Sequence, residues 1–208
     1  TTYTLRALLG STGTARIRVY DVPPDLTGTL TPGGPAVNMA TVPGQKAIYT
    51  FSGTIGTDLA LTFANNTYAT CWMYVNAPDN TNLVSRACSS ASHVNLPPLQ
   101  SAQPYTLIVH PWNTSSGGVS LSLLAPSTAA LSVDGSPQTV TTTVPGQSAQ
   151  FTFAGVSGQR IGAQATGDTF SQCQQFSLIR PDGTVLATPP AGCEGGLFLG
   201  GETLTSTG

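Results

Sequence analysis

Charged residues are scarce in this chain. Only 8% of its 208 residues are charged, and Lys46 is the only lysine, whereas typical soluble domains carry about 25% charged residues. Seven Lys and Arg against nine Asp and Glu leave a formal net charge of -2, so there is no basic field to neutralise a run of phosphates. The composition therefore argues against nucleic acid as a partner. A surface of Thr, Ser, Asn and Gln suits an exported, extracellular β-rich protein.

Long apolar runs are absent as well. The longest, such as residues 119–125, fall far short of the roughly 20 residues that cross a bilayer. No membrane span is expected, and no signal peptide opens the sequence. Disorder is not expected either, because it goes with few β-branched residues and high net charge. The chain should fold, with a length that suits one large or two ordinary domains.

The strongest pattern that is present is an internal repeat at an offset of 102 residues. Val-Pro-Gly-Gln occurs twice, each time followed by an alternating aromatic phrase, and Cys71 and Cys173 keep the same offset. The matching segments are 42–45 with 144–147, 47–53 with 149–155, and 3–5 with 105–107. One register therefore relates the two halves of the chain, as expected for an array of similar structural units.

Each repeat has the pattern of an all-β unit. Apolar and polar residues alternate with a period of two, for example over 59–63 and 119–123, which is typical of half-buried strands. Pro-Gly, Pro-Asp-Gly and Ser-Gly turn formers separate these stretches, and no segment keeps a helical period for three turns. The sequence predicts two tandem β-sandwich or jelly-roll repeats of about 100 residues.

The second repeat is predicted to be split across the chain ends. The first repeat covers 26–125, and the second covers 126–208 without its own Tyr-Thr-Leu strand, whose match lies in 1–25. We expect 1–25 to form a hairpin that completes the second-type repeat of a preceding unit, by strand exchange or in a longer covalent array. Folding back onto its own second repeat is disfavoured, because short segments join the two pieces to opposite ends of the first repeat. The core-facing, inter-subunit residues of the hairpin are predicted to be Tyr3, Leu5, Ala7, Leu9, Ile17 and Val19.

Several phrases of the sequence carry a family resemblance. They are Val-Pro-Gly-Gln, Tyr-Thr-Phe-Ser-Gly at 49–53, Arg-Pro-Asp-Gly-Thr-Val-Leu-Ala at 180–187, Tyr-Thr-Leu-Ile-Val-His-Pro at 105–111 and Gly-Val-Ser-Leu-Ser-Leu at 118–123. Together they resemble the bacterial pre-peptidase C-terminal domain and its tandem-repeat relatives, which implies jelly-roll modules of exported proteins. That family usually has an acidic Asp-x-Asp-like strand in mid-domain. Here Cys-Trp-Met-Tyr at 71–74 or Cys-Gln-Gln-Phe at 173–176 stands there, so metal binding is not carried over.

The four cysteines form two predicted disulfides, one in each repeat. Cys71 pairs with Cys88 and Cys173 with Cys193, each pair flanking a Pro-Asp turn that would bring two strands together. Closing loops of about 17 to 20 residues stabilises a fold by on the order of 3 kcal/mol, in the oxidising compartments where such bonds persist. The alternative is four buried free thiols. A zinc site is disfavoured because there is no Cys-x-x-Cys.

Residues suited to catalysis are few. His93 and His110 have no counterparts in the other repeat, and no Gly-x-Ser-x-Gly elbow is present. Most aspartates lie in predicted turns, namely Asp25, Asp79, Asp134 and Asp182. Calcium binding by Asp79 or Asp182 stays open, although one carboxylate in each loop is a weak signal. The sequence predicts no enzyme, no cofactor and no metal.

The predicted function is structural. We expect a non-enzymatic extracellular or cell-surface protein, either a head-to-tail filament subunit or a segment of a surface array, whose partner is itself. The alternative is an accessory or adhesion module that binds surface polysaccharide or protein. A sugar-stacking face would use Trp72, Tyr74, Tyr68 and Trp112, for which core packing is the favoured interpretation.

Overall fold

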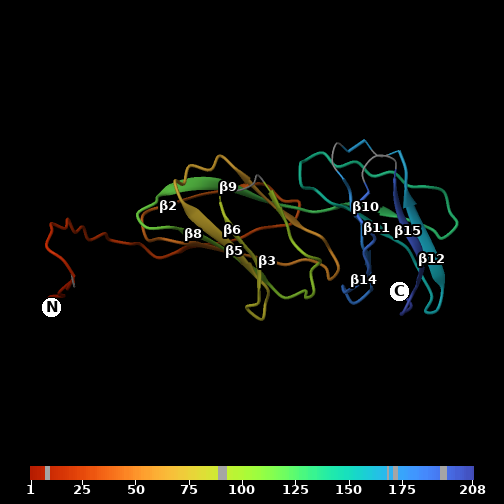
Figure 1. Cartoon of the computed structure of the whole chain (residues 1–208), viewed down its shortest axis with the longest axis horizontal. Coiled ribbons are helices and arrows are strands. Elements are labelled where there is room, and N and C mark those ends of the chain that lie inside the picture. The colour runs from red at the N-terminus through yellow and green to blue at the C-terminus, as the bar shows by residue number, and fades with distance from the viewer. Residues whose placement is uncertain (8–9, 89–92, 168, 171–172, 193–195) are drawn as a thin grey trace.

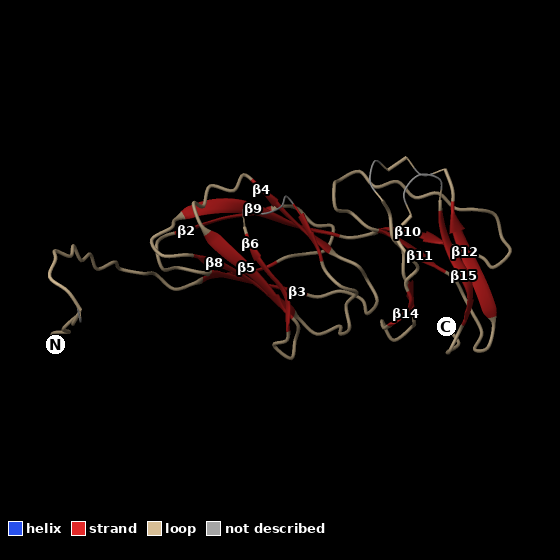
Figure 2. Cartoon of the chain, viewed as in Figure 1, coloured by secondary structure: helices blue, strands red, loops and turns tan. Residues whose placement is uncertain are grey.

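Regular structure in this protein is entirely β. The computed structural model describes residues 1–7, 10–88, 93–167, 169–170, 173–192 and 196–208. These residues contain strands β1 to β15 and no helix (Figure 2), which confirms the all-β prediction. In the described ranges there is accordingly no helix long and apolar enough to cross a membrane.

Strands β1 to β9 build a first unit of two facing sheets (Figure 1). Their bounds are β1 Leu26–Thr29, β2 Val37–Thr41, β3 Ala47–Phe51, β4 Ala60–Ala64, β5 Cys71–Asn76, β6 Asn82–Ala87, β7 His93–Asn95, β8 Tyr105–Pro111 and β9 Gly117–Leu124. One sheet has the order β1-β3-β8-β5-β6 and the other β2-β9-β4-β7. Only the β1–β3 pair is parallel among these neighbours. The unit is therefore a β-sandwich.

The core of the first unit lies between the two sheets. Along β8, Tyr105, Leu107 and Val109 are buried and alternate with half-buried residues, as the period of two predicts. From the facing sheet, Leu121 and Leu123 of β9 join the same core cluster. Strands β8 and β9 thus supply five of the eleven largest fully buried side chains of this core.

The remaining strands form a second unit that is much less closed. Their bounds are β10 Ser127–Ala130, β11 Ala149–Thr152, β12 Arg160–Ala165, β13 Leu178–Ile179, β14 Val185–Ala187 and β15 Leu197–Thr203. They pair only as β10-β11, β12-β15 and β13-β14 among the described residues. Ile161, Leu199 and Leu204 make a small buried cluster. No continuous sheet of four or five strands is present in this part of the described chain.

The two units share local structure at the repeat offset. β10 pairs with β11 in parallel, as β1 does with β3. In both Val-Pro-Gly-Gln turns the glycine has positive φ, 86° at Gly44 and 87° at Gly146. Gln45 Nε2 donates to Pro24 O over 2.7 Å, and Gln147 Nε2 donates to Ala125 O over 3.1 Å. In each unit the glutamine side chain therefore holds its turn against the residues that precede the first strand of that unit.

The N-terminal segment stands apart from both units. The described residues before Leu26 contain no strand, and the segment extends from the end of the first unit that faces away from the second unit (Figure 1). Its last residues are held there. A Cβ on Gly44 would lie 3.0 Å from Val22 Cγ2, and Asp25 Oδ1 accepts a 2.8 Å bond from the Lys46 backbone.

Candidate functional site

In the described part of the second unit, no strand takes the place that β8 or β9 has inside its sheet. In the first unit, β8 lies between β3 and β5, and β9 lies between β2 and β4. At the repeat offset, β11 corresponds to β3 and β12 to β4. Among the described residues of 126–208, no strand lies beside β11 or β12 on the side where β8 or β9 would pair. β11 and β12 therefore each have an unpaired edge in the described part of the second unit, and we call these two edges the gaps; residues 139–143, the equivalent of β2, form no strand.

Repeat-equivalent residues show the consequence of these gaps. Tyr49 is 6% exposed and Tyr68 is 6% exposed in the first unit. Their counterparts Phe151 and Phe170 are 40% and 49% exposed. Because chemically similar side chains are buried in one unit and open in the other, the second unit has apolar surface that a folded sandwich would cover.

The N-terminal segment carries the matching side chains, and they are exposed. Tyr3 is 92%, Leu5 70% and Val19 82% exposed, with Ile17 and Ala7 exposed as well. Their equivalents on β8 and β9 are almost completely buried. Leu9, also predicted to face a core, lies outside the described residues. No contact with the second unit of the same chain is made by the described part of this segment (Figure 1).

The segment departs from the β8–β9 pattern in two ways. The position equivalent to Leu123 is Asp21, a charged residue that would lie at the end of the strand. The sequence also predicted a hairpin, but β8 and β9 lie in different sheets. The hairpin stays a prediction; its equivalents in the first unit, β8 and β9, lie in the two facing sheets instead of forming one antiparallel pair. We call residues 1–22 the clasp segment.

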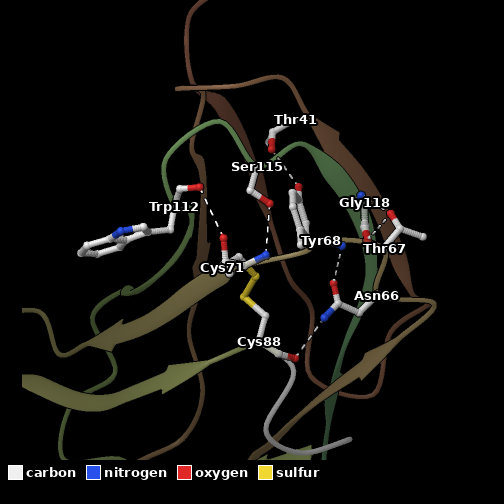
Figure 3. Close-up of a disulfide and its surroundings, with 10 residues drawn as sticks. Thr41, Asn66, Thr67, Tyr68, Cys71, Cys88, Trp112, Ser115 and Gly118 are labelled. Atoms are coloured by element: carbon white, nitrogen blue, oxygen red, sulfur yellow. Dashed lines mark hydrogen bonds between the residues drawn. A yellow bond between two sulfur atoms is a disulfide. The ribbon is translucent and has the colours of Figure 1, made fainter. Parts of the chain in front are cut away.

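The first predicted disulfide is present. Cys71 and Cys88 are bonded, with their Cα atoms 5.4 Å apart, a normal separation for a disulfide. The bond joins the start of β5 to the end of the β6 hairpin, and the amide of Asn66 donates to the Cys88 carbonyl over 3.3 Å (Figure 3). Cys173 is also disulfide-bonded. Its predicted partner, Cys193, lies outside the described residues, so that pairing stays a prediction.

The turn aspartates have structural partners. Asp79 Oδ1 accepts from the Thr81 backbone over 2.9 Å, which holds the pKa of that carboxyl below its usual value. Asp182 Oδ1 accepts from the Thr184 hydroxyl and backbone, which likewise lowers its pKa. No group of three or more His, Cys, Asp or Glu able to hold a metal ion occurs in the described ranges. Both carboxylates therefore act as turn acceptors.

Two tryptophans face outward, contrary to the favoured expectation. Tyr68 is buried and its hydroxyl lies 2.9 Å from Thr41 Oγ1, as core packing predicts. Trp72 and Trp112, however, are among the exposed large hydrophobic residues. Trp72 lies opposite His110 on the neighbouring strand, and the ring centroids of His110 and Trp112 are 6.1 Å apart. The core-packing expectation is wrong for both indoles.

A polar hollow adjoins Trp112. Its volume is about 400 Å³, and its wall consists of Trp112 and of residues 67, 69, 70 and 113–116, none of them charged. Figure 3 shows the indole projecting away from the disulfide at this end of the sheet. Burial, and then the nearby charge of Lys46, lower the pKa of His110. The surface is thus aromatic, hydroxyl-rich and weakly charged.

Comparison with known proteins finds only distant similarity. No protein-family model matches this chain, and no curated protein matches its sequence. One similar solved structure is the pre-peptidase C-terminal domain of a collagenase from Bacillus anthracis, with 14% identity, 50% of this chain and 99% of that chain covered, and a TM-score of 0.39. Another is the Aeromonas hydrophila protein PliG, a periplasmic inhibitor of g-type lysozyme, with 11% identity, 48% and 98% covered, and a TM-score of 0.36. The first of these structures bears the name of the domain that the sequence phrases resemble.

Proposed function

We propose that this chain is a non-enzymatic extracellular structural protein that joins end to end with further units of its own kind. The observation that carries the proposal is the unpaired edge of β11 and of β12 in the second unit, together with an exposed segment of matching sequence at the other end. Completion comes either from the clasp segment of another copy or from an equivalent segment in a longer covalent array. In both cases the product is a thread of β-sandwiches.

The geometry of the first unit opposes completion within one chain. In the first sandwich, Leu124 lies opposite Ala60, and β10 starts three residues later. The equivalent of Leu124 is Val22. To complete the second unit of its own chain, Val22 would have to lie at the end of that unit that corresponds to the position of Leu124 in the first unit. Val22 instead packs against the Gly44 turn, with β9 between that turn and the second unit. The eight residues of β9 span about 26 Å at roughly 3.3 Å per residue, so the clasp segment cannot take this position in its own chain.

The contact so formed uses two different surfaces. One copy supplies the clasp segment and the other supplies the gaps, so each joined pair still has one free clasp segment and one open unit. Such heterologous contacts propagate as open fibres unless the rotation between units closes a ring. The unpaired strand edges that border the gaps favour addition of further strands. A linear assembly is therefore the natural product.

Composition and disulfide bonding support an extracellular location. Disulfides persist in oxidising compartments, and Cys71–Cys88 is formed here. The carboxylates of Asp79 and Asp182 accept hydrogen bonds within their own turns. These observations support a structural role in place of a catalytic one.

The test is assembly of the purified full-length chain. Negative-stain electron microscopy and sedimentation velocity should show threads, and deletion of residues 1–22 should abolish them. Calorimetry of the deletion variant should still show the unfolding transition of the first unit, because none of the described residues of 1–22 belongs to its core cluster. A reducing denaturing gel of the material from its natural source separates the two routes, since a covalent array stays large and strand exchange gives single chains. Persistent threads after the deletion would falsify the proposal.

A second function is favoured by the outward indoles, namely binding of a neutral polysaccharide. Exposed Trp112 beside a hollow lined by hydroxyl and amide groups offers a stacking surface and hydrogen-bonding groups without charge, which suits sugar rings. Retention on insoluble cellulose and chitin tests this. Trp112→Ala should weaken retention about tenfold, equivalent to about 1.4 kcal/mol. Phe198→Ala, at another exposed aromatic residue, is the control and should leave retention unchanged; equal retention of all three proteins would exclude the site.

A further inference from the structure

The first unit provides a template for the contact between copies, and this inference rests on the proposed function. We propose that the clasp segment of a second copy fills both gaps of the second unit at once, in the register of β8 and β9. The partner is thus this same chain, and the recognised surface is a defined set of positions. The register follows from adding the repeat offset to the pairs observed in the first unit.

The first gap lies beside β11. In the first unit, β3 pairs with β8 so that Phe51 is opposite Tyr105 and Tyr49 is opposite Leu107. The equivalent pairs are Phe153 with Tyr3 and Phe151 with Leu5 of the second copy. Rings of Phe51 and Tyr105 are stacked, with centroids 5.5 Å apart. Tyr3, like Tyr105, would stack on its partner ring, here that of Phe153. Phe153 is half-buried in the open unit.

The second gap lies beside β12. In the first unit, Phe63 of β4 is opposite Leu121 of β9. The equivalent pair is Ala165 with Val19 of the second copy. The clasp segment therefore presents Tyr3 and Leu5 to the core from one sheet, and Val19 from the other. Both sheets are completed by a single segment because the β8–β9 connection crosses between them.

The start of the second inserted strand has its own anchor. Thr67 N donates to Gly118 O over 2.9 Å, and Gly118 N donates to Thr67 Oγ1 over 2.8 Å. The equivalent positions are Thr169 and Arg16. Position 169 keeps a threonine, whose hydroxyl can accept the second bond. Residue 16 would take part in both bonds only through its backbone N and O. A Cβ at Gly118 would lie 2.7 Å from Met39 O of β2, so Arg16 fits this position only because residues 139–143, the equivalent of β2, form no strand in the second unit.

The clasp segment and the second unit, which would accept it, carry net charges of opposite sign. Residues 1–22 carry three arginines and one aspartate, a net charge of +2, whereas 126–208 carry two arginines and five acidic residues, a net charge of -3. Residues 26–125 carry one lysine, one arginine and two aspartates and are neutral. Opposite charges on donor and acceptor accelerate encounter between copies. They also favour the second unit over the first as the docking partner.

Cysteine pairs between separate copies test the register. Chains with Leu5→Cys and chains with Phe151→Cys are purified separately, mixed at full length and oxidised mildly. A non-reducing gel should show a crosslinked dimer. The control mixes Leu5→Cys with Gln150→Cys, which is shifted by one residue and so faces the other side of the sheet, and its yield should be at least tenfold lower. Threads of the parent chain together with equal yields in both mixtures overturn the register and leave the proposed function standing, whereas absence of threads of the parent chain overturns both.

A synthetic peptide of residues 1–22 gives a second readout that needs no substitution. It should cap open second units and shorten threads in proportion to its concentration, while a scrambled peptide of the same composition and charge should not. Raising NaCl from 20 to 500 mM should slow peptide binding about tenfold, as electrostatic steering predicts. If the scrambled peptide shortens threads equally, the side-chain register is refuted and only charge attraction remains.

Discussion

Leu5 and Leu107 are equivalent leucines, and their truncation separates folding from assembly. Leu107 has no exposed surface, so Leu107→Ala should leave a cavity and lower the free energy of unfolding of the first unit by about 2 to 5 kcal/mol. Leu5 is 70% exposed in the single chain, so Leu5→Ala should leave the unfolding free energy of the monomer unchanged. In the proposed contact Leu5 becomes as buried as Leu107.

The free energy lost through the cavity then weakens association between copies instead of the folding of one chain. A loss of about 2 kcal/mol or more corresponds to a dissociation constant at least roughly 30-fold higher. Denaturant titration of the dilute monomer gives the first quantity, and sedimentation velocity over a concentration series gives the second. The reasoning is refuted if Leu5→Ala assembles as well as the parent chain, or if it destabilises the monomer as much as Leu107→Ala does.

Further predictions concern the disulfides and one histidine. Replacing Cys71 and Cys88 together by alanine should cost the first unit about 3 kcal/mol, from closure of a 17-residue loop, and calorimetry should show its melting temperature fall by roughly 10 to 25 °C. Non-reduced peptide mapping should recover Cys173 linked to Cys193, and a link between the units would contradict the repeat register. The pKa of His110 is lowered in the fold, so the unfolded chain binds more protons below about pH 6.5. Stability should therefore be full above that pH and decline on acidification, and His110→Gln should reduce the decline between pH 7 and 5.5 in urea titrations; an unchanged pH profile would contradict the assignment.

Local patterns in the sequence were sufficient for several features. The period of two along residues 105–109 predicts which side chains of β8 are buried, because successive side chains of a strand point to opposite faces. The Val-Pro-Gly-Gln turn and the Cys71–Cys88 bond were predictable for a similar reason. Their partners lie within a few residues of one another or flank a single turn, so the sequence by itself determined the all-β class, the repeat offset and the first disulfide.

Only the tertiary structure decided the order of the strands in each sheet and the outward orientation of the tryptophan side chains. That β8 lies between β3 and β5 depends on pairs such as Ala47 with Val109, which are far apart in the chain and have no local signature. The same long-range order places β8 and β9 in different sheets, which no local pattern of the two strands indicates. It also turns Trp72 outward: an alternating pattern fixes two opposite faces of a strand, but which face is covered depends on where the other sheet packs.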